Sequence, residues 1–320
     1  MTVEEQMQYL GEVEPLLQGK ELEWQQLHGG LAHVTYVVSV DGHRVVVKFL
    51  TQEMDQFGLM VPMQHLIHNT TCAGECGVGA RVLRTYPDLP AIVLEFIDGK
   101  TLCTEDLGDP GYIPRLARAV HKLHTSAPPF SNRIDIFCFL EDYLRLVETH
   151  GMETPAGLLE ELPTIRRIQE ALAFNALPLV PSNNDLLARN VMDDGTIRLI
   201  DYDFSGMNDP MFDLGDLAME GDYDPNQIRV LCDTYFGEHV PAQYARARLF
   251  GVAAQFTWSL LFVGMAKLLS SKPAETFDYW NEAVIRWDWT RQKLAAPDLD
   301  TTIAAAASTG TAAPSSSHPG

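Results

Sequence analysis

In the stretch NNDLLARNVMDDGTIRLID, polar residues stand at intervals that suit phosphate chemistry. Asp185 is followed five residues later by Asn190, and an apolar segment then ends at Asp201. Phosphoryl transfer requires mainly that the protein position the reactants and neutralise charge, with Mg²⁺ on the phosphates and a base on the acceptor hydroxyl. Mg²⁺ takes oxygen ligands, which an Asp carboxylate and an Asn carbonyl provide. The pattern therefore predicts that one Asp orients a hydroxyl group while the Asn and the second Asp hold metal.

Two further elements must bring these side chains to a phosphate group. A short strand over residues 196–201 would return the chain so that Asp201 faces the loop of Asp185. Lys48 lies in the segment RVVVKF, where alternation places it on the same strand face as Val46. Phosphoryl transfer also needs a cation on the nucleotide phosphates.

The N-terminal part of the chain has the pattern of an antiparallel sheet with helices beside it. Residues 1–18 repeat apolar side chains at helical spacing, and a second helix is expected around residues 61–74. The pair Asp41-Gly42 is a strong signal for a two-residue hairpin. The expected strands are three between residues 22 and 49 and two between residues 81 and 96, the last of them from Ala91 to Phe96.

From Gly111 onward the apolar residues recur at three- and four-residue steps, which predicts helices. The expected helices begin with the segment YIPRLARAVHKLHTS and continue at residues 139–149, 163–174, 225–236, 242–269 and 274–294. The end of the chain, TTIAAAASTGTAAPSSSHPG, is too small and polar to offset the entropy of ordering. We therefore predict an α+β protein with a β-rich lobe at 1–98, a mainly helical lobe at 99–297 and a disordered tail at 298–320.

Composition and charge exclude several classes of function. The net charge of -20 opposes binding to nucleic acid and to anionic membranes, which usually bind Lys/Arg patches. It favours a small cationic partner, or phosphates whose charge is neutralised by metal ions. The five cysteines are irregularly spaced, and no apolar run approaches the length of a membrane span. We therefore expect a cytoplasmic protein with no membrane partner.

The segments NNDLLARN and LIDYDFSGMNDPMFDLGDLA resemble the catalytic and metal-binding segments of bacterial choline and ethanolamine kinases, within the broader aminoglycoside phosphotransferase-like group. The resemblance continues in GGLAHVTYVV, VVVKF, GVGARVL, VLEFIDGKTL, LARAVHKLH and FDYWNEAVIRW, and so covers residues 29–287. It implies a protein-kinase-like fold of two lobes, an antiparallel β lobe and a mainly helical lobe, with ATP bound between them.

The same resemblance implies roles for individual residues. It makes Asp185 the catalytic base, and Asn190 and Asp201 the ligands of Mg²⁺. Lys48 would hold the α- and β-phosphates of ATP, covered by the turn at Gly29 and Gly30. The connection between the lobes, formed by Glu95, Phe96 and Ile97, would meet adenine through its backbone groups.

The acceptor implied by the resemblance is a small cationic amino alcohol. Carboxylates and aromatic faces complement such a cation. The resemblance places Asp203 and Trp258 at the acceptor, and it assigns Asp213 mainly to holding the acceptor-side loop.

Two residues depart from the family pattern. Asn183 stands where the family usually has a His that braces the catalytic loop, and its amide could replace part of that bracing. Leu66 stands near the place of the helix acid that pairs with the strand lysine, with Gln64 and His65 as possible substitutes. Because that ion pair positions the lysine, its loss leaves open a slow enzyme or a nucleotide-binding protein without catalysis.

Three hypotheses follow for the function. The first is an Mg-ATP-dependent kinase for the hydroxyl of choline, ethanolamine or a related amino alcohol. The second is an aminoglycoside or amino-sugar kinase, which would share the nucleotide machinery and differ in the acceptor pocket. The third is a pseudokinase, against which the intact Mg²⁺ ligands argue.

Overall fold

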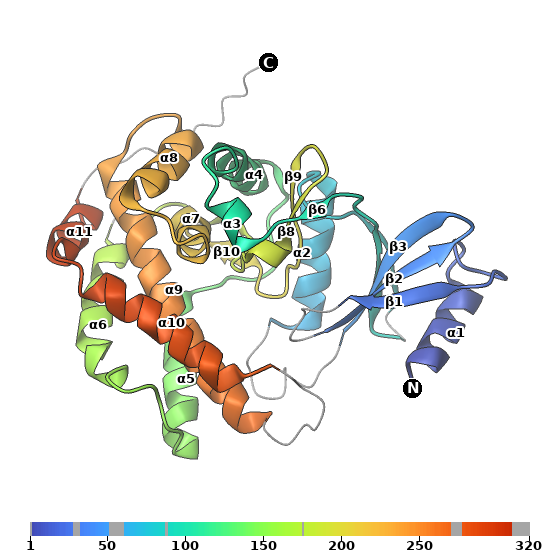
Figure 1. Cartoon of the computed structure of the whole chain (residues 1–320), viewed down its shortest axis with the longest axis horizontal. Coiled ribbons are helices and arrows are strands. Elements are labelled where there is room, and N and C mark those ends of the chain that lie inside the picture. The colour runs from blue at the N-terminus through green and yellow to red at the C-terminus, as the bar shows by residue number, and fades with distance from the viewer. Residues whose placement is uncertain are drawn as a thin grey trace.

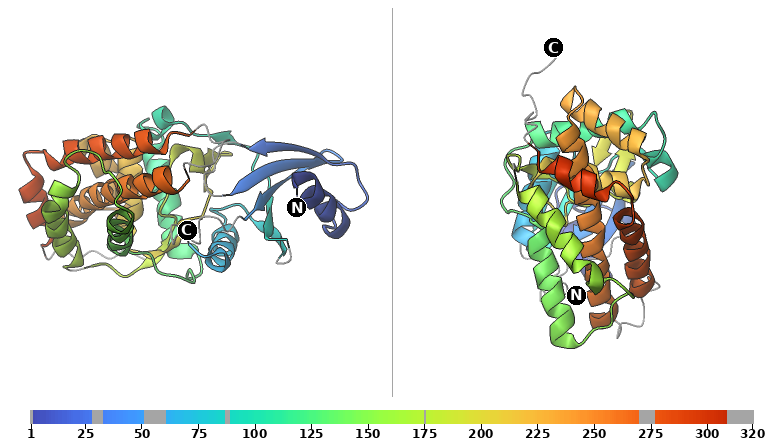
Figure 2. Two further views of the ribbon diagram at one scale, coloured as in Figure 1. Left: turned by 90° about the horizontal axis from the view of Figure 1, so that it is seen from below. Right: turned by 90° about the vertical axis from the view of Figure 1, so that its left-hand side faces the viewer.

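The chain folds into a small β-rich lobe and a larger helical lobe (Figure 1). The computed structural model describes residues 2–27, 33–50, 61–86, 89–174, 176–269 and 277–308. The sheet and helix α1 form one end of the molecule and the long helices form the other, with α2 between them (Figures 1 and 2). This arrangement confirms the predicted α+β fold, while the predicted lobe boundary after residue 98 stays a prediction.

The N-terminal lobe is a five-stranded antiparallel sheet in the order β1-β2-β3-β5-β4. Its elements are α1 (Val3–Val13), β1 (Glu23–Leu27), β2 (Val34–Val40), β3 (His43–Phe49), α2 (Met63–Glu75), β4 (Val82–Tyr86) and β5 (Ala91–Glu95). The predicted hairpin joins β2 to β3, because Asp41 and Gly42 both have positive φ, at 48° and 78°. Such a turn matches the right-handed twist of the two strands. All the strands and helices predicted for this lobe are confirmed.

Alternation along β3 separates the two faces of this sheet. Val45 and Val47 lie in a core with Met7 and Leu10, which helix α1 contributes. The opposite face carries Lys48 and is turned toward α2. The predicted alternation along RVVVKF is therefore confirmed, and it directs the lysine away from the α1 core.

The C-terminal lobe is built around one long helix, α9 (Pro241–Leu268), which packs against α5, α7, α10 and α11. Its other helices are α3 (Thr104–Leu107), α4 (Ile113–Ser126), α5 (Ile136–His150), α6 (Leu162–Ala173), α7 (Pro210–Glu220), α8 (Pro225–Phe236), α10 (Tyr279–Leu294) and α11 (Leu299–Ala306), with short 3-10 turns at Leu159–Glu161 and Ala188–Asn190. Among the described residues, α9 is the one helix with the length and composition of a membrane span. Most of its apolar window, 94%, is buried inside the protein, as the core helix of a globular fold would be.

Several short elements of this lobe escape the sequence patterns. They are β6 (Lys100–Thr101), β7 (Val180–Ser182), β8 (Val191–Asp193) and β10 (Gly206–Asn208), together with helices α3 and α7. The short strand predicted over residues 196–201 is confirmed as β9 (Ile197–Leu199). Strands β6, β8 and β9 form one small sheet, and β7 pairs with β10. Helix α7 begins with an Asp209 N-cap followed by Pro210, which is a recognisable start signal. These elements matter because they carry the loops of the candidate site.

The prediction of a disordered tail from residue 298 is wrong for its first part. Residues 299–306 form α11, which packs on α9 and α6. Thr302 and Ala306 are buried there, and Arg248 of α9 makes an ion pair with Asp298 at the start of the helix. Tertiary contacts therefore order a segment whose composition alone indicates disorder. Residues 309–320 lie outside the described part of the chain.

Candidate active site

Asp185 and Asn190 lie on one loop between β7 and β8, and their side chains touch. The Asn190 amide nitrogen donates to the Asp185 carboxylate oxygen Oδ2 at 3.0 Å and to the Asp185 backbone oxygen at 2.9 Å. No described residue donates a hydrogen bond to Asn190 Oδ1, so the carbonyl oxygen of the same amide is available as a ligand. The spacing read from the sequence thus corresponds to a direct contact.

Burial, followed by the charge of Asp201, raises the pKa of Asp185 to about 7. Such a carboxyl exchanges its proton near neutral pH, which suits a group that accepts a proton from a hydroxyl.

Helix α7 holds this loop through two buried carboxylates. Asp213 accepts the backbone N–H groups of Asn183 at 3.0 Å and Asn184 at 2.8 Å, and His124 lies 3.0 Å from the same carboxylate. Asp216 accepts the N–H of Leu186 at 2.9 Å. Asn184 itself has a φ of 66°, in the left-handed region where a non-glycine residue needs support. The expected role of Asp213 in holding a loop agrees with these contacts, while Asp216 was not identified from the sequence.

Asn183 braces the site from the position where the family usually has His. Its side-chain nitrogen donates to the backbone oxygens of Ile200 at 3.3 Å and Asp201 at 3.0 Å. Its side-chain oxygen accepts the N–H of Asp185 at 3.1 Å. The amide therefore links the segment of Asp185 to the segment of Asp201, as the sequence analysis suggested it could.

Asp201 follows strand β9 and faces the lysine of β3. Its φ of 61° turns the chain sharply at the end of the strand. The Lys48 ammonium lies 2.9 Å from Asp201 Oδ1. Burial acts to raise the pKa of Asp201, but the Lys48 ammonium, together with hydrogen bonds from Asp203 and Lys48 and the charge of His33, lowers this pKa to about 2. Asp201 is therefore an anion in position to accept a metal ion.

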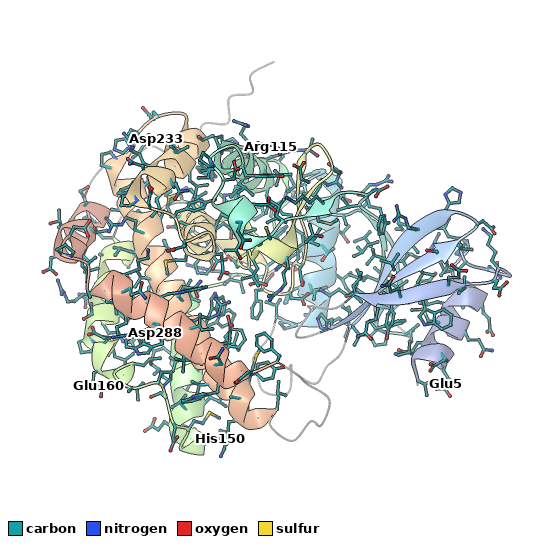
Figure 3. The ribbon with its side chains drawn as sticks, in the orientation of Figure 1. Glu5, Arg115, His150, Glu160, Asp233 and Asp288 are labelled. Carbon is teal, nitrogen blue, oxygen red and sulfur yellow. The ribbon has the colours of Figure 1, made fainter. Side chains whose placement is uncertain are left out.

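The β8–β9 hairpin that carries this segment is fixed from outside. Arg115 of α4, labelled in Figure 3, donates to both carboxylate oxygens of Asp193 at 2.7 and 2.6 Å. Such a two-bonded pair has a defined geometry. It holds β8 against α4, at the end of the hairpin away from Asp201.

A cavity of about 410 Å³ adjoins Lys48 and Asp201 between the two lobes. Its walls contain apolar side chains from the sheet on one side and from β8 and the segment after β9 on the other, together with several polar groups. The lining includes Val46, Leu94, Met192 and Ile200 among the apolar residues, and Lys48, Asn190 and Asp201 among the polar ones. Its size and lining are typical of a small-molecule site.

Glu95, Phe96 and Ile97 line this cavity, and their expected contact with adenine stays a prediction. The Glu95 side chain points to arginines, with Arg81 Nε at 2.8 Å and an Arg198 guanidinium nitrogen at 2.7 Å. These ion pairs fix the connection between the lobes. Gly29 and Gly30, expected to cover the phosphates, lie outside the described residues.

Asp203 is turned toward Lys48. Its carboxylate makes a short hydrogen bond with the Lys48 ammonium and lies 3.8 Å from His33 Nε2. Burial, followed by the charge of Asp201, raises the pKa of Asp203 well above its usual value, and the Lys48 ammonium opposes this shift only in part.

A second polar cluster, called the acceptor-side cluster after the role proposed for it below, joins helices α7, α9 and α10. Arg286 of α10 donates to Glu220 of α7 at 3.0 Å and to Gln255 of α9 at 2.6 Å. Gln255 in turn donates to Glu220 at 3.0 Å. The charge of Glu220 contributes to the raised pKa of Asp185, which indicates that the two carboxyls are near one another. Three helices that are distant in sequence meet here, so the sequence analysis did not identify this cluster.

Trp258 lies one helical turn after Gln255 and is 5% exposed. Its ring packs on Phe204 and Phe139, with centroid distances of 5.1 and 6.1 Å. The indole is thus part of the core beside the acceptor-side cluster, and its role toward an acceptor stays a prediction.

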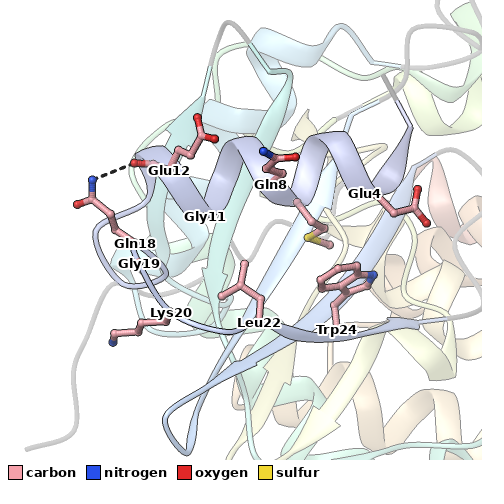
Figure 4. A pocket seen from close by; sticks show the side chains of 10 residues that line it. Glu4, Gln8, Gly11, Glu12, Gln18, Gly19, Lys20, Leu22 and Trp24 are labelled. Carbon is pink, nitrogen blue, oxygen red and sulfur yellow. Dashed lines mark hydrogen bonds between the residues drawn. The ribbon is translucent and has the colours of Figure 1, made fainter.

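A second hollow lies on the N-terminal lobe, between α1 and the start of β1 (Figure 4). It is lined by Gln8, Leu22 and Trp24, and Gln18 donates to the Glu12 backbone oxygen at its margin. None of the candidate catalytic residues lines it, so we place the active site at the cavity between the lobes.

Known proteins resemble this chain in both sequence and fold. The chain matches the sequence model of the family Choline/ethanolamine kinase over residues 25–235. It is 24% identical to ethanolamine kinase 2 of Rattus norvegicus over 72% of this chain and 65% of that protein, less than two thirds of the relative's length.

Among solved structures, a choline/ethanolamine kinase family protein from Mesorhizobium loti aligns with a TM-score of 0.82 and 26% identity, over 96% of this chain and 99% of that chain. The choline kinase LicA from Streptococcus pneumoniae shares the fold, with a TM-score of 0.73 and 20% identity over 91% of this chain and 99% of that chain. LicA has also been solved in complex with AMP. On the extent of the family match, this chain belongs to the choline/ethanolamine kinase family.

Proposed function

We propose that the protein is an Mg-ATP-dependent phosphotransferase that phosphorylates the hydroxyl group of choline, ethanolamine or a closely related amino alcohol. The observation that carries the proposal is the convergence of Lys48, Asn190 and Asp201 on one cavity, with Asp185 in contact with Asn190, in a chain of this family. These residues supply the base, the oxygen ligands and the phosphate-binding cation that phosphoryl transfer requires.

The nucleotide would occupy the cavity between the lobes. The apolar lining suits an adenine ring, and the ammonium group of Lys48 suits phosphates. The backbone of residues 95–97 would meet the adenine edge, and the Lys48 ammonium would contact the phosphates. Nucleotide binding by LicA, solved with AMP, supports this use of the site.

The residues present fit Mg²⁺. The described residues contain no group of three or more His, Cys, Asp or Glu side chains able to hold a metal ion by themselves. Mg²⁺ is usually held by one or two protein oxygens together with substrate phosphates, so the Asn190 carbonyl and the Asp201 carboxylate are a suitable pair. Bound there, Mg²⁺ would neutralise charge on the phosphates during transfer.

Asp185 would orient the acceptor hydroxyl and accept its proton. The Asn190 amide fixes one carboxylate oxygen at 3.0 Å, so the other is left for the hydroxyl. The cluster of Glu220, Gln255 and Arg286 would form the far wall of the acceptor site, with Trp258 packed behind it. Carboxylates near the acceptor complement a small cation.

The test is ADP release from Mg-ATP with a panel of choline, ethanolamine, related amino alcohols, aminoglycosides and amino sugars. We expect turnover on an amino alcohol, and loss of that turnover in Asp185→Asn. Asp142→Asn is the matched control, since it makes the same change at an exposed site on α5. Omitting Mg²⁺ should also abolish turnover.

The same panel separates the alternatives. Turnover on aminoglycosides or amino sugars alone would replace the proposed acceptor with the second hypothesis. ATP binding without turnover on any acceptor would favour the pseudokinase, for which the apolar burial of Leu66 is the motivating observation.

A further inference from the structure

Lys48 needs an acidic partner to stay directed at nucleotide phosphates, because an ammonium on a flexible four-carbon stem is otherwise mobile. In protein kinases that partner is a Glu on the helix beside the sheet. Here the corresponding helix is α2, and Leu66 is 1% exposed and packs with Leu50 and Ile92. The helix therefore directs an apolar residue at the sheet.

The strand register places Leu66 over the face that carries the lysine. Ile92 pairs with Lys48 across β3 and β5, and side chains of paired residues lie on the same face of a sheet. The substitutes considered on α2 point elsewhere: Gln64 is exposed, and His65 is 2.8 Å from the Ser131 hydroxyl. No described residue of α2 thus supplies the acid.

Two carboxylates of the segment after β9 contact Lys48 instead. Asp201 Oδ1 lies at 2.9 Å and Asp203 Oδ1 lies closer still. The Lys48 and Asp203 side chains are 10% and 9% exposed, so this contact is shielded from water. Asp201 is also the proposed metal ligand, so a bound metal ion would compete with Lys48 for its carboxylate. The contact between Asp203 and Lys48 does not have this competition.

Helix α2 still supports this arrangement, but by another route. Asn69 is fully buried, and its amide nitrogen donates to the Ser205 backbone oxygen at 3.1 Å and hydroxyl at 3.0 Å. The Ser205 hydroxyl donates to the Tyr202 backbone oxygen at 2.6 Å, which closes the turn around Asp203. The helix therefore fixes the segment that carries the carboxylate rather than contributing a carboxylate itself.

We infer that Asp203 is a positioning residue that holds Lys48 toward the nucleotide phosphates in place of the missing helix acid. The inference rests on the nucleotide site of the proposed function. It gives Asp203 a role at the nucleotide, whereas the resemblance alone places it at the acceptor. Leu66 is then compatible with an active kinase, because the lysine has its acidic partner on another element.

The first test measures nucleotide affinity directly, without acceptor, by titration calorimetry with ATP in the presence and absence of Mg²⁺. Loss of one charge-assisted contact should make Asp203→Asn bind ATP about 10-fold or more weakly. Asp203→Glu, which keeps the carboxyl group, should bind more tightly than Asp203→Asn. Asp142→Asn controls for the change in net charge, and its affinity for ATP should equal that of the wild type.

A second test asks whether an acid on α2 can replace Asp203. Leu66→Glu in the Asp203→Asn background should recover part of the lost ATP affinity, since Leu66 faces the side of the sheet that carries Lys48. Thermal unfolding of each variant shows whether it is folded. In steady-state assays, Asp203→Asn should raise the KM for ATP and leave the KM for the acceptor unchanged.

Wild-type ATP affinity in a folded Asp203→Asn variant, with a raised KM for the acceptor, would overturn the inference and return Asp203 to the acceptor site. The two proposals fail separately. Wild-type protein that binds ATP but turns over no acceptor overturns the proposed function only, because the affinity comparison still tests Asp203. Wild-type protein that binds no ATP overturns both.

Discussion

The buried ion pair between Arg286 and Glu220 allows a quantitative test of the acceptor-side cluster. Arg286 is 6% exposed and contacts Glu220 at 3.0 Å, Gln255 at 2.6 Å and Glu282 at 2.9 Å. Arg286→Met removes the cation and leaves Glu220 without a charged partner next to the carboxyl of Asp216. Breaking a buried pair from one side costs about 3–5 kcal/mol in the free energy of unfolding.

The companion variants determine whether that cost comes from an uncompensated charge. Glu220→Gln keeps a hydrogen-bonding group against Gln255 and leaves Arg286 paired with Glu282, so we expect a loss of about 1–3 kcal/mol. The double variant contains neither member of the pair. Its loss should fall short of the sum of the two single losses by at least about 1 kcal/mol.

Urea unfolding at neutral pH, followed by circular dichroism, gives the four free energies. Arg145→Met is the control, because Arg145 pairs with Asp142 at an exposed site and its removal should change stability by about 0.5 kcal/mol or less. Strict additivity of the two single losses would refute the reasoning, since it would mean that Arg286 and Glu220 are not energetically coupled.

Three other predictions concern residues that support the site. Asp213→Asn leaves one loop N–H without a carboxylate oxygen, so it should cost about 1–3 kcal/mol and lower kcat about 10-fold or more, measured by unfolding and ADP release. Arg115 lowers the pKa of Asp193 to about 2, so the ion pair should add about 1 kcal/mol to the free energy of unfolding above pH 4. This contribution should be lost as the pH falls toward 2, and the urea midpoint of Asp193→Asn should lack that pH dependence. Gly251→Ala places a methyl group 2.6 Å from the Gly215 backbone oxygen and should cost about 1–3 kcal/mol or more, measured in the same assay.

The sequence predicts those parts of the site whose residues are close in the chain or lie on strongly patterned elements. Asp185 and Asn190 touch because five residues of one loop separate them, and Lys48 is placed by the alternation of β3. The position of Asp201 after β9 is likewise predicted, because a short apolar strand ends in a turn at this residue. Local pattern and local chemistry agree at each of these positions.

The parts that the sequence does not predict depend on contacts between distant elements. Arg286, Gln255 and Glu220 come from three helices, and nothing in the pattern of any one helix indicates that they meet. Helix α11 forms from small residues because α9 and α6 cover it. An Asp at position 203 could bind a cationic acceptor, as its residue type suggests. The turn that Asn69 and Ser205 fix directs the Asp203 carboxylate to Lys48 instead.

Helix α7 supports both the loop of Asp185, the proposed base, and the acceptor-side cluster. Near its start Asp213 holds the backbone before Asp185, one turn later Asp216 holds the backbone after it, and in its last turn Glu220 faces Arg286. A displacement of this helix would therefore move the catalytic loop and the acceptor-side cluster together. The close approach of α7 and α9 at Gly215 and Gly251, where a Cβ at either position would clash with backbone, restricts that displacement. Since Gly251 contributes no side chain to the loop or the cluster, a loss of activity in folded Gly251→Ala would indicate that the position of the helices links them.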